Sequence, residues 1–171
     1  KWMDGWESRR KRTPGNDWCI ISLGVSGSIQ AVDIDTIHFL GNHPPFGAVD
    51  VTTASPDATP EQLRDQAVWT EILAPSALDP GSHNLFTVAA NSGATHLRLR
   101  IYPAGGVARL RVYGTPTAPT SRCDLSCATS GAFVICASDR FFAHPDQLLS
   151  PAPAEHMGSG WETKRRRTPG I

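Results

Sequence analysis

His96-Leu97-Arg98-Leu99-Arg100-Ile101-Tyr102 and Ala108-Arg109-Leu110-Arg111-Val112-Tyr113 are the two runs that decide the fold class. Strict alternation of apolar and polar side chains is the period of a β-strand with one buried face. The leucine, isoleucine and valine side chains should therefore face the core, and the arginines should face solvent. Between the runs, Pro103-Ala104-Gly105-Gly106 has the composition of a tight turn, so we expect the two strands to form a hairpin.

Other short segments carry the same kind of pattern. Apolar runs bounded by turn residues predict strands at residues 18–23, 29–35, 48–53, 69–73 and 131–137, with a turn at residues 25–28. One short helix should begin at Thr59 and end near Val68, because Thr59 can cap it, Pro60 suits its first position and Gln62 completes a capping box. Many short strands and one short helix indicate an all-β protein, an antiparallel β-sandwich.

Length and charge narrow the possible partners. A chain of 171 residues is long enough for one domain with a real core. No apolar run approaches the roughly 20 residues of a membrane helix, so we expect no membrane partner. The 16 basic and 16 acidic side chains give a formal net charge of zero, although half of the basic residues lie in two runs, residues 9–12 and 164–167. That balance makes nucleic acid an unexpected partner.

The four cysteines do not form a metal-binding pattern. Cys19 and Cys136 lie in apolar runs and are expected in the core. Cys123 and Cys127 could form a disulfide in an oxidising compartment. We favour free thiols in a cytoplasmic protein, with a peroxisomal location as a second possibility.

A repeated motif organises the chain. Residues 5–15, Gly-Trp-Glu-Ser-Arg-Arg-Lys-Arg-Thr-Pro-Gly, register with residues 160–170, Gly-Trp-Glu-Thr-Lys-Arg-Arg-Arg-Thr-Pro-Gly. The repeat predicts that residues 1–114 are most of a first repeat. Residues 115–130 would then be a linker, and residues 131–171 the opening segment of a second repeat.

The basic runs and Glu7 allow several interpretations. Each run could be a solvated or salt-bridged loop, a nucleic-acid patch, or an anion site in which arginine forks bind a carboxylate with two parallel hydrogen bonds. Glu7 could pair with Arg9 or could serve a site, as a weak base or as an acceptor for N–H groups.

Together with three further stretches, the motif resembles the allantoicase repeat. Asp-Trp-Cys-Ile-Ile follows the first copy at residues 17–21, and the other stretches are residues 32–42, 101–114 and 137–142. The resemblance spans nearly the whole chain and implies a galactose-binding-like jelly roll that hydrolyses allantoate to ureidoglycolate and urea in purine breakdown. Two residues depart from the family pattern: Asn16 stands where the family often has histidine, and Ala104 where it often has aspartate.

The chemistry implied by the resemblance suggests roles for particular residues. Allantoate needs a cationic clamp on its carboxylate, a base for water and hydrogen-bond donors to the departing urea. We expect Arg10 and Arg12, with Arg9 beside them, to bind the carboxylate. His38 and Glu7 are the candidate catalytic residues, and Asn42 the candidate orienting donor.

The same stretch raises the question of a metal. His43 lies close to His38 in sequence, and the two could bind a divalent metal, but no third ligand is evident, so no metal or cofactor is expected.

Two other functions remain open. A non-catalytic jelly roll could bind a small anion or a sugar, or the chain could be a structural repeat whose partner repeat holds the site, in which case this chain alone would be inactive. We also expect the protein to form a homo-oligomer. In the order of the family that this chain resembles, an opening strand precedes each motif, so the resemblance implies that residues 1–114 lack their opening strand. Residues 131–149 should fill that position, within the chain or between two chains. The second motif would then have no sandwich to join, and deletion of residues 157–171 should cost little stability.

Overall fold

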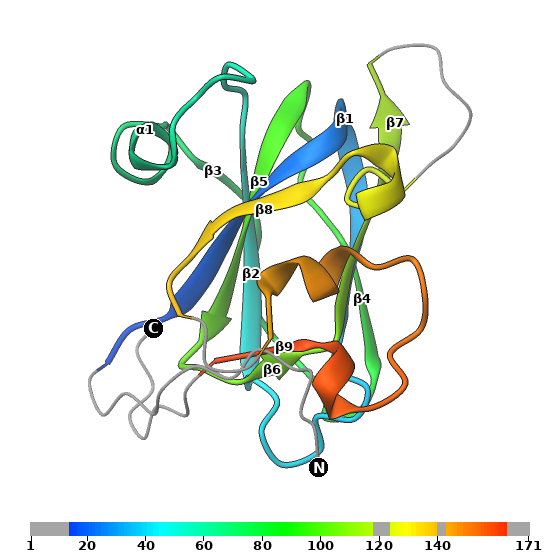
Figure 1. The fold of residues 1–171 in the computed structure, drawn as a ribbon. Coiled ribbons are helices and arrows are strands. Elements are labelled where there is room, and N and C mark those ends of the chain that lie inside the picture. Colours follow the sequence, from blue (N-terminus) through cyan, green and yellow to red (C-terminus); the bar gives the residue numbers. More distant parts are fainter. Residues whose placement is uncertain (1–13, 118–123, 140–142, 164–171) are drawn as a thin grey trace.

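The computed structural model describes residues 14–117, 124–139 and 143–163 (Figure 1). Its strands are β1 (Asp17–Asp35), β2 (Phe46–Thr52), β3 (Thr70–Ala77), β4 (His83–Thr87), β5 (Ala94–Tyr102), β6 (Gly106–Val107), β7 (Arg109–Pro116), β8 (Phe133–Ala137) and β9 (Trp161–Glu162). The helix α1 (Pro60–Asp65) and the 3₁₀ segments η1 (Ala128–Ser130), η2 (Pro145–Leu149) and η3 (Met157–Ser159) complete these ranges. The strands within these ranges pair in antiparallel fashion, which confirms the predicted all-β class. No helix among them is long and apolar enough to cross a membrane.

β1 is the strand at which two layers of sheet meet. Its first part, residues 17–22, pairs with β5 and β8, and its last part, residues 27–35, pairs with β7 and β4. One layer therefore has the order β3-β2-β5-β1-β8 and the other the order β4-β1-β7. The turn predicted at residues 25–28 is wrong. The chain stays extended there, and an irregular register between Ser22 and Gly27 accompanies the change of layer.

The alternating runs are strands, as predicted, but they do not pair with each other. β5 lies between β1 and β2 in one layer, whereas β7 pairs with β1 in the other, so residues 103–108 cross between layers. The hairpin prediction is therefore wrong, because turn composition specifies a change of direction and not a partner strand. The predicted core residues of both runs are confirmed as buried: Leu97, Leu99, Ile101, Leu110 and Val112. Burying each such side chain stabilises the fold by about 1.5–3 kcal/mol.

The arginines of these strands do not form the solvated face that alternation predicts. Arg98 and Arg100 each place a guanidinium nitrogen 2.7 Å from the buried carboxylate of Asp50 on β2. Arg109 is itself buried, at 3% exposure, and donates to backbone oxygens of the segment 152–159, including that of Ala152 at 2.9 Å. Partners from distant parts of the chain therefore cover these charges.

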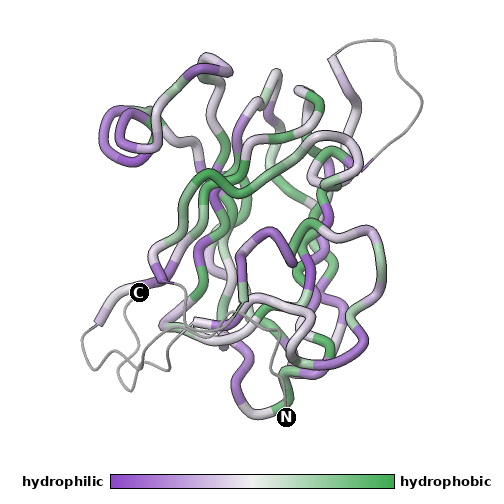
Figure 2. The backbone as a smooth tube through the Cα atoms, in the orientation of Figure 1, coloured by the Kyte–Doolittle hydropathy of each residue, from purple (hydrophilic) through white to green (hydrophobic). Residues whose placement is uncertain are grey.

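The short helix begins where its sequence predicts. Thr59 accepts a hydrogen bond from the backbone N–H of Gln62, the Gln62 side chain accepts one from the backbone N–H of Thr59, and Pro60 occupies the first turn. The helix ends at Asp65, three residues before the predicted end at Val68, and buries only Leu63. Figure 2 shows the result: α1 is largely hydrophilic, and the hydrophobic residues lie on the central strands.

Residues 131–139 and 143–163 pack on the preceding strands. β8 pairs with residues 19–22 of β1, and Leu148 and Leu149 of η2 are buried in the same core. The start of the second motif is also buried, because β9 pairs with β6 and Trp161 has no exposed surface. Residues 160–163 therefore do pack on the sandwich, contrary to the premise of the deletion prediction, and we now expect deletion of residues 157–171 to cost stability.

His96 makes folding stability depend on pH. It is 2% exposed, and burial lowers its pKa below the usual range because the charged form is desolvated. The unfolded chain then takes up a proton at a higher pH than the folded chain. The stabilisation is complete above the unfolded pKa of about 6.5 and is lost as pH falls through the lowered folded pKa.

We expect the melting temperature to fall between pH 7.5 and pH 5.5, and to fall less in His96→Gln, which cannot titrate. Thermal melts monitored by circular dichroism measure this difference. His156→Gln, at an exposed position, is the matched control and should keep the wild-type pH dependence. An identical acid-induced drop in His96→Gln and in the wild-type chain would contradict the assignment.

Candidate functional site

The loop between β1 and β2 is held in place at its start. Asp35 ends β1, and its carboxylate accepts a hydrogen bond of 2.8 Å from the backbone N–H of Ile37. The Thr36 hydroxyl is 2.6 Å from the carbonyl oxygen of Asp79, to which it donates, and Phe39 is fully buried. These contacts fix the backbone from which His38 and Asn42 project.

The turn after β5 meets this loop. The N–H of Gly106 donates to the carbonyl oxygen of Asn42 at 2.8 Å. Gly105 has a φ of 155°, and a Cβ at that position would lie 2.4 Å from the backbone nitrogen of Pro44. Only glycine permits two backbone segments to approach so closely.

Residues 160–163, the start of the second motif, pack on the surface formed by Phe39, Asn42, Gly105, Val107 and Ala108, which we call the cradle. The Asn42 amide donates to Oε1 of Glu162, and the N–H of Gly105 donates to Oγ1 of Thr163 at 2.6 Å. The N–H of Thr163 in turn donates to the carbonyl oxygen of Gly105. Glu162 is 5% exposed and Thr163 is 1% exposed. The hydrogen bond between the Asn42 amide and the Glu162 carboxylate is therefore largely shielded from solvent.

The structure brings only part of the predicted site together. Asn42 lies in the cradle, against Glu162, which is the counterpart of Glu7 in the second motif. The predicted residues Glu7, Arg9, Arg10 and Arg12 lie outside the described ranges.

His38 points elsewhere. Its Nε2 is 2.9 Å from the carbonyl oxygen of Ala154, and no contact joins it to Asn42 or Glu162 within the described ranges. A carbonyl oxygen only accepts, so Nε2 carries the proton and Nδ1 keeps the lone pair. His38 also has a φ of 71°, a left-handed conformation that is uncommon for residues other than glycine but that histidine, asparagine and aspartate adopt more often than most.

Sequence reasoning assigned the carboxylate to the first copy and missed Glu162 and Thr163. The repeat itself contained the information, because every cradle contact made by residues 160–163 involves a residue type that the first copy also has or closely matches. Of the two departures from the family pattern, Ala104 lies buried in the cradle turn, next to Gly105.

His43 does not complete a metal site with His38. Its Nδ1 is buried without a hydrogen-bond partner in the described part of the chain, and burial lowers its pKa while the charge of Asp79 acts in the opposite direction. Among the residues that the structure describes, no group of three or more histidine, cysteine, aspartate or glutamate side chains could hold a metal ion. Cys19, Cys127 and Cys136 are free thiols, and Cys123 lies outside the described ranges.

A second cluster of ionisable groups lies on the layer β4-β1-β7. Nδ1 of His83 is 2.8 Å from Oδ2 of Asp33, and Arg111 lies 3.6 Å from the carboxylates of both Asp33 and Asp35. Burial raises the pKa of Asp33, against the opposing hydrogen bond and charge of His83. Both aspartates are buried, because β4 and β7 flank them. The opposite charges of this cluster therefore compensate one another, although Oδ1 of Asp33 and one guanidinium nitrogen of Arg111 are buried without a hydrogen-bond partner in the described residues.

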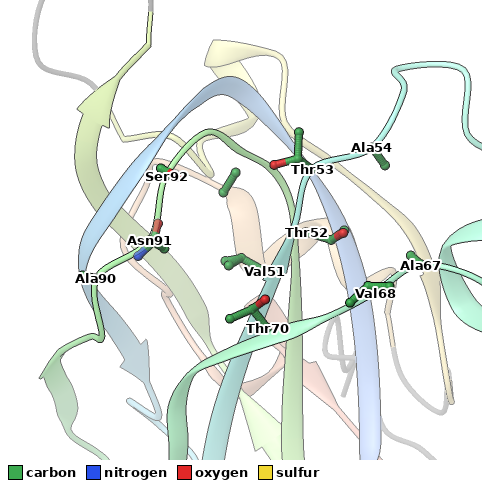
Figure 3. Close-up of a pocket in the computed structure, with 11 residues that line it drawn as sticks. Val51, Thr52, Thr53, Ala54, Ala67, Val68, Thr70, Ala90, Asn91 and Ser92 are labelled. Carbon is green, nitrogen blue, oxygen red and sulfur yellow. The ribbon is translucent and has the colours of Figure 1, made fainter.

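The structure has a hollow of about 540 Å³ at the far end of β2 from the cradle (Figure 3). Threonine, alanine, valine, serine and asparagine side chains line it, among them Thr52, Val68 and Asn91. None of the residues that line it carries an ionisable side chain. It could accept a neutral ligand, but it offers no cation for a carboxylate and no base.

Comparison with known proteins identifies the family. The family model described as the allantoicase repeat matches residues 1–117 and 123–171. Proteins named probable allantoicase are 48% identical in Acinetobacter baylyi and 47% identical in Photobacterium profundum, over 100% and 99% of this chain. The matches cover 51% and 52% of those proteins, so the chain spans about half the length of these curated relatives.

Solved structures agree. A structure titled as that of allantoicase superposes with a TM-score of 0.61 at 36% identity, covering 99% of this chain and 54% of the other. The crystal structure of allantoicase from Saccharomyces cerevisiae gives a TM-score of 0.60 at 37% identity, covering 98% of this chain and 53% of the other. By sequence and by fold, the chain belongs to the allantoicase family.

Proposed function

We infer that the protein containing this chain hydrolyses allantoate to ureidoglycolate and urea, and that the cradle together with the motif packed on it forms the substrate site. One observation carries the proposal: the Asn42–Glu162 pair lies at the cradle, and the basic run at residues 164–167 begins immediately after Thr163. A carboxylate, an amide and a series of arginines are the groups that allantoate requires. The family relationship supports the same substrate.

The reaction replaces one ureido group by water. In our proposal, arginine forks of the basic run bind the substrate carboxylate, which fixes the central carbon in the site. The glutamate of the motif accepts hydrogen bonds from the ureido N–H groups, and the Asn42 amide orients this glutamate. A base removes a proton from water as its oxygen bonds to the central carbon. Urea leaves with the electrons of the broken C–N bond and with one proton.

His38 is the proposed base, although in the described residues it has no contact with Asn42 or Glu162, so this role requires the substrate to extend from the motif glutamate toward His38. It would act through Nδ1, because Nε2 donates to Ala154. No metal or other cofactor enters this scheme.

Urea release from allantoate tests the proposal. The chain and the full-length relative from Acinetobacter baylyi should be assayed together, with product formation followed by a coupled urea assay. The relative should release urea, and this chain should bind allantoate even if its turnover requires the other half of the protein. If the relative is active and the chain neither binds nor hydrolyses allantoate, this half does not contain the substrate site.

A specific observation favours one alternative function. The hollow beside Thr52 and Asn91 offers polar groups without charge, as a neutral ligand such as a sugar requires. A non-catalytic jelly roll of this kind would bind such a ligand there and would not discriminate in favour of allantoate. The homo-oligomeric state stays a prediction, which size-exclusion chromatography with light scattering can measure.

The arginine forks provide a quantitative test. Lysine keeps the charge of Arg10 or Arg165 but cannot form two parallel hydrogen bonds. Because the two residues occupy equivalent positions in the two copies, both should be changed together. The pair Arg10→Lys/Arg165→Lys should weaken allantoate binding more than tenfold, or about 1.4 kcal/mol, by calorimetric titration. Arg64→Lys, at an exposed position on α1, is the control, and equal affinities for the pair and this control would reject the clamp.

His38→Asn separates chemistry from backbone conformation. Asparagine enters the left-handed region readily, so stability should change by less than about 1 kcal/mol. Loss of the imidazole should lower urea release by about 100-fold or more, the usual contribution of a general base. The measurement is the turnover rate of a form of the protein that releases urea, compared with the same form carrying His156→Asn. An unchanged rate would remove His38 from the mechanism.

A further inference from the structure

We propose that the cradle is a recognition site for the sequence Gly-Trp-Glu-[Ser/Thr], and that residues 5–8 of the same chain bind it in competition with residues 160–163. The cradle reads all four positions of this sequence by contacts that can be named. Both copies satisfy those contacts. Only one copy can occupy the cradle at a time.

Steric fit selects the residues at the first two positions of the sequence. A Cβ on Gly160 would lie 2.6 Å from the Cα of Ala108 and 2.8 Å from the Phe39 ring, so any larger residue would collide with backbone. Trp161 pairs with Val107 in the β6–β9 ladder and has no exposed surface, although it belongs to a two-residue strand. The cradle therefore accepts glycine followed by tryptophan at these two positions.

The last two positions are read by hydrogen bonds. The Asn42 amide donates to the Glu162 carboxylate. The N–H of Gly105 donates to the hydroxyl of Thr163 at 2.6 Å, in a position where Thr163 is 1% exposed. A buried N–H without an acceptor costs about 1–3 kcal/mol, so the fourth residue must carry a hydroxyl.

The first copy meets each requirement. Gly5, Trp6 and Glu7 are identical to Gly160, Trp161 and Glu162, and Ser8 supplies the hydroxyl that Thr163 supplies in the second copy (these pairs follow from the repeat register). Serine is also the smaller side chain, so it adds no clash.

The chain is long enough for the first copy to reach. Asp17 pairs with Ile101, which lies four residues before Gly105, so at most about 14 Å of backbone separates Ile101 from the cradle turn. The nine residues from Ser8 to Asp17 can span up to about 30 Å. Both copies are tethered to the cradle, so each binds in an intramolecular reaction at high effective concentration.

Exchange would change the basic run that follows the bound motif in the sequence. With the second copy bound, the run that follows is Lys-Arg-Arg-Arg, and with the first copy bound it is Arg-Arg-Lys-Arg. The glutamate and the hydroxyl stay equivalent. The cradle therefore selects between two versions of the same motif without altering the groups that it contacts directly.

Thermal melts of four full-length chains test the proposal without substrate: wild type, Trp6→Ala, Trp161→Ala and the double variant. We expect Trp6→Ala to melt close to wild type. The melting temperature of Trp161→Ala should fall by less than half as much as that of the double variant, because the first copy then replaces the second in the cradle. Equal shifts at two protein concentrations would show that the replacement is intramolecular, whereas a concentration-dependent shift would overturn the same-chain occupant in favour of a second chain.

If Trp161→Ala and the double variant melt at the same temperature, only the second copy binds and the proposal is wrong. It is equally wrong if the double variant melts like the wild-type chain. If either alanine variant is unfolded at 20 °C, the phenylalanine variants Trp6→Phe, Trp161→Phe and their double variant allow the same comparison of melting temperatures, because they lose less stability. A failed urea assay would not affect these outcomes.

Discussion

Replacing both Trp6 and Trp161 with alanine should lower the free energy of unfolding by about 3–5 kcal/mol, the usual cost of truncating a large buried aromatic side chain. Trp161 is fully buried, and its Nε1 is 3.5 Å from the carbonyl oxygen of Asp139, so it links the segment before β9 to the cradle. Changing both copies removes the possibility that one tryptophan replaces the other. For a chain of this length the expected loss is roughly 6–20 °C in melting temperature.

Urea denaturation and thermal melts measure this loss. Val68→Ala is the control, because that apolar side chain is 84% exposed and its truncation should change stability by less than about 0.5 kcal/mol. A double tryptophan variant as stable as Val68→Ala would show that the buried position of Trp161 contributes nothing to the fold.

Replacing both Glu7 and Glu162 with glutamine should reduce urea release by about 100-fold or more. Glutamine keeps the size of the side chain and an oxygen that can accept from Asn42, but it loses the negative charge. In the proposed mechanism that charge binds the ureido N–H groups most strongly as urea departs, and interactions made only in the transition state lower the turnover rate when they are lost. The binding constant for allantoate should change less than kcat.

Steady-state kinetics of the double glutamine variant measures this effect in any form of the protein that releases urea. The matched control is Thr163→Ser, which keeps the hydroxyl that Gly105 contacts and should retain activity within a few-fold. Wild-type kcat in the double glutamine variant would show that the motif carboxylate has a structural role alone.

Local patterns predicted the local parts of this fold. The alternation at residues 97–101 and 108–112 identified the buried residues, and the capping box at Thr59 identified the start of α1, because both depend on neighbours in the sequence. The choice of partner strand for β5 and for β7 could not be predicted in this way. It depends on β1, which is long enough to join both layers and lies far from both strands in the sequence.

The site shows the same limit. Asn42 was predicted from its place in a loop, and the structure places it in the cradle against a carboxylate. That carboxylate belongs to Glu162, 120 residues away, and not to a described residue of the first copy. Arg109 was expected in solvent, and it is buried because backbone oxygens of the segment 152–159 cover it. Long-range contacts of this kind leave no periodicity in the sequence.

The central claim is that the cradle binds allantoate, and titration of the ¹⁵N-labelled chain with allantoate, followed by amide chemical shifts, tests it most directly. At 18.4 kDa the chain is suited to this measurement. The account predicts saturable shifts centred on the amides of Asn42, Gly105, Gly106 and Thr163, with the amides of Thr52 and Asn91 unchanged. Shifts centred on the hollow beside Thr52 and Asn91, or no saturable shifts at millimolar allantoate, would contradict it.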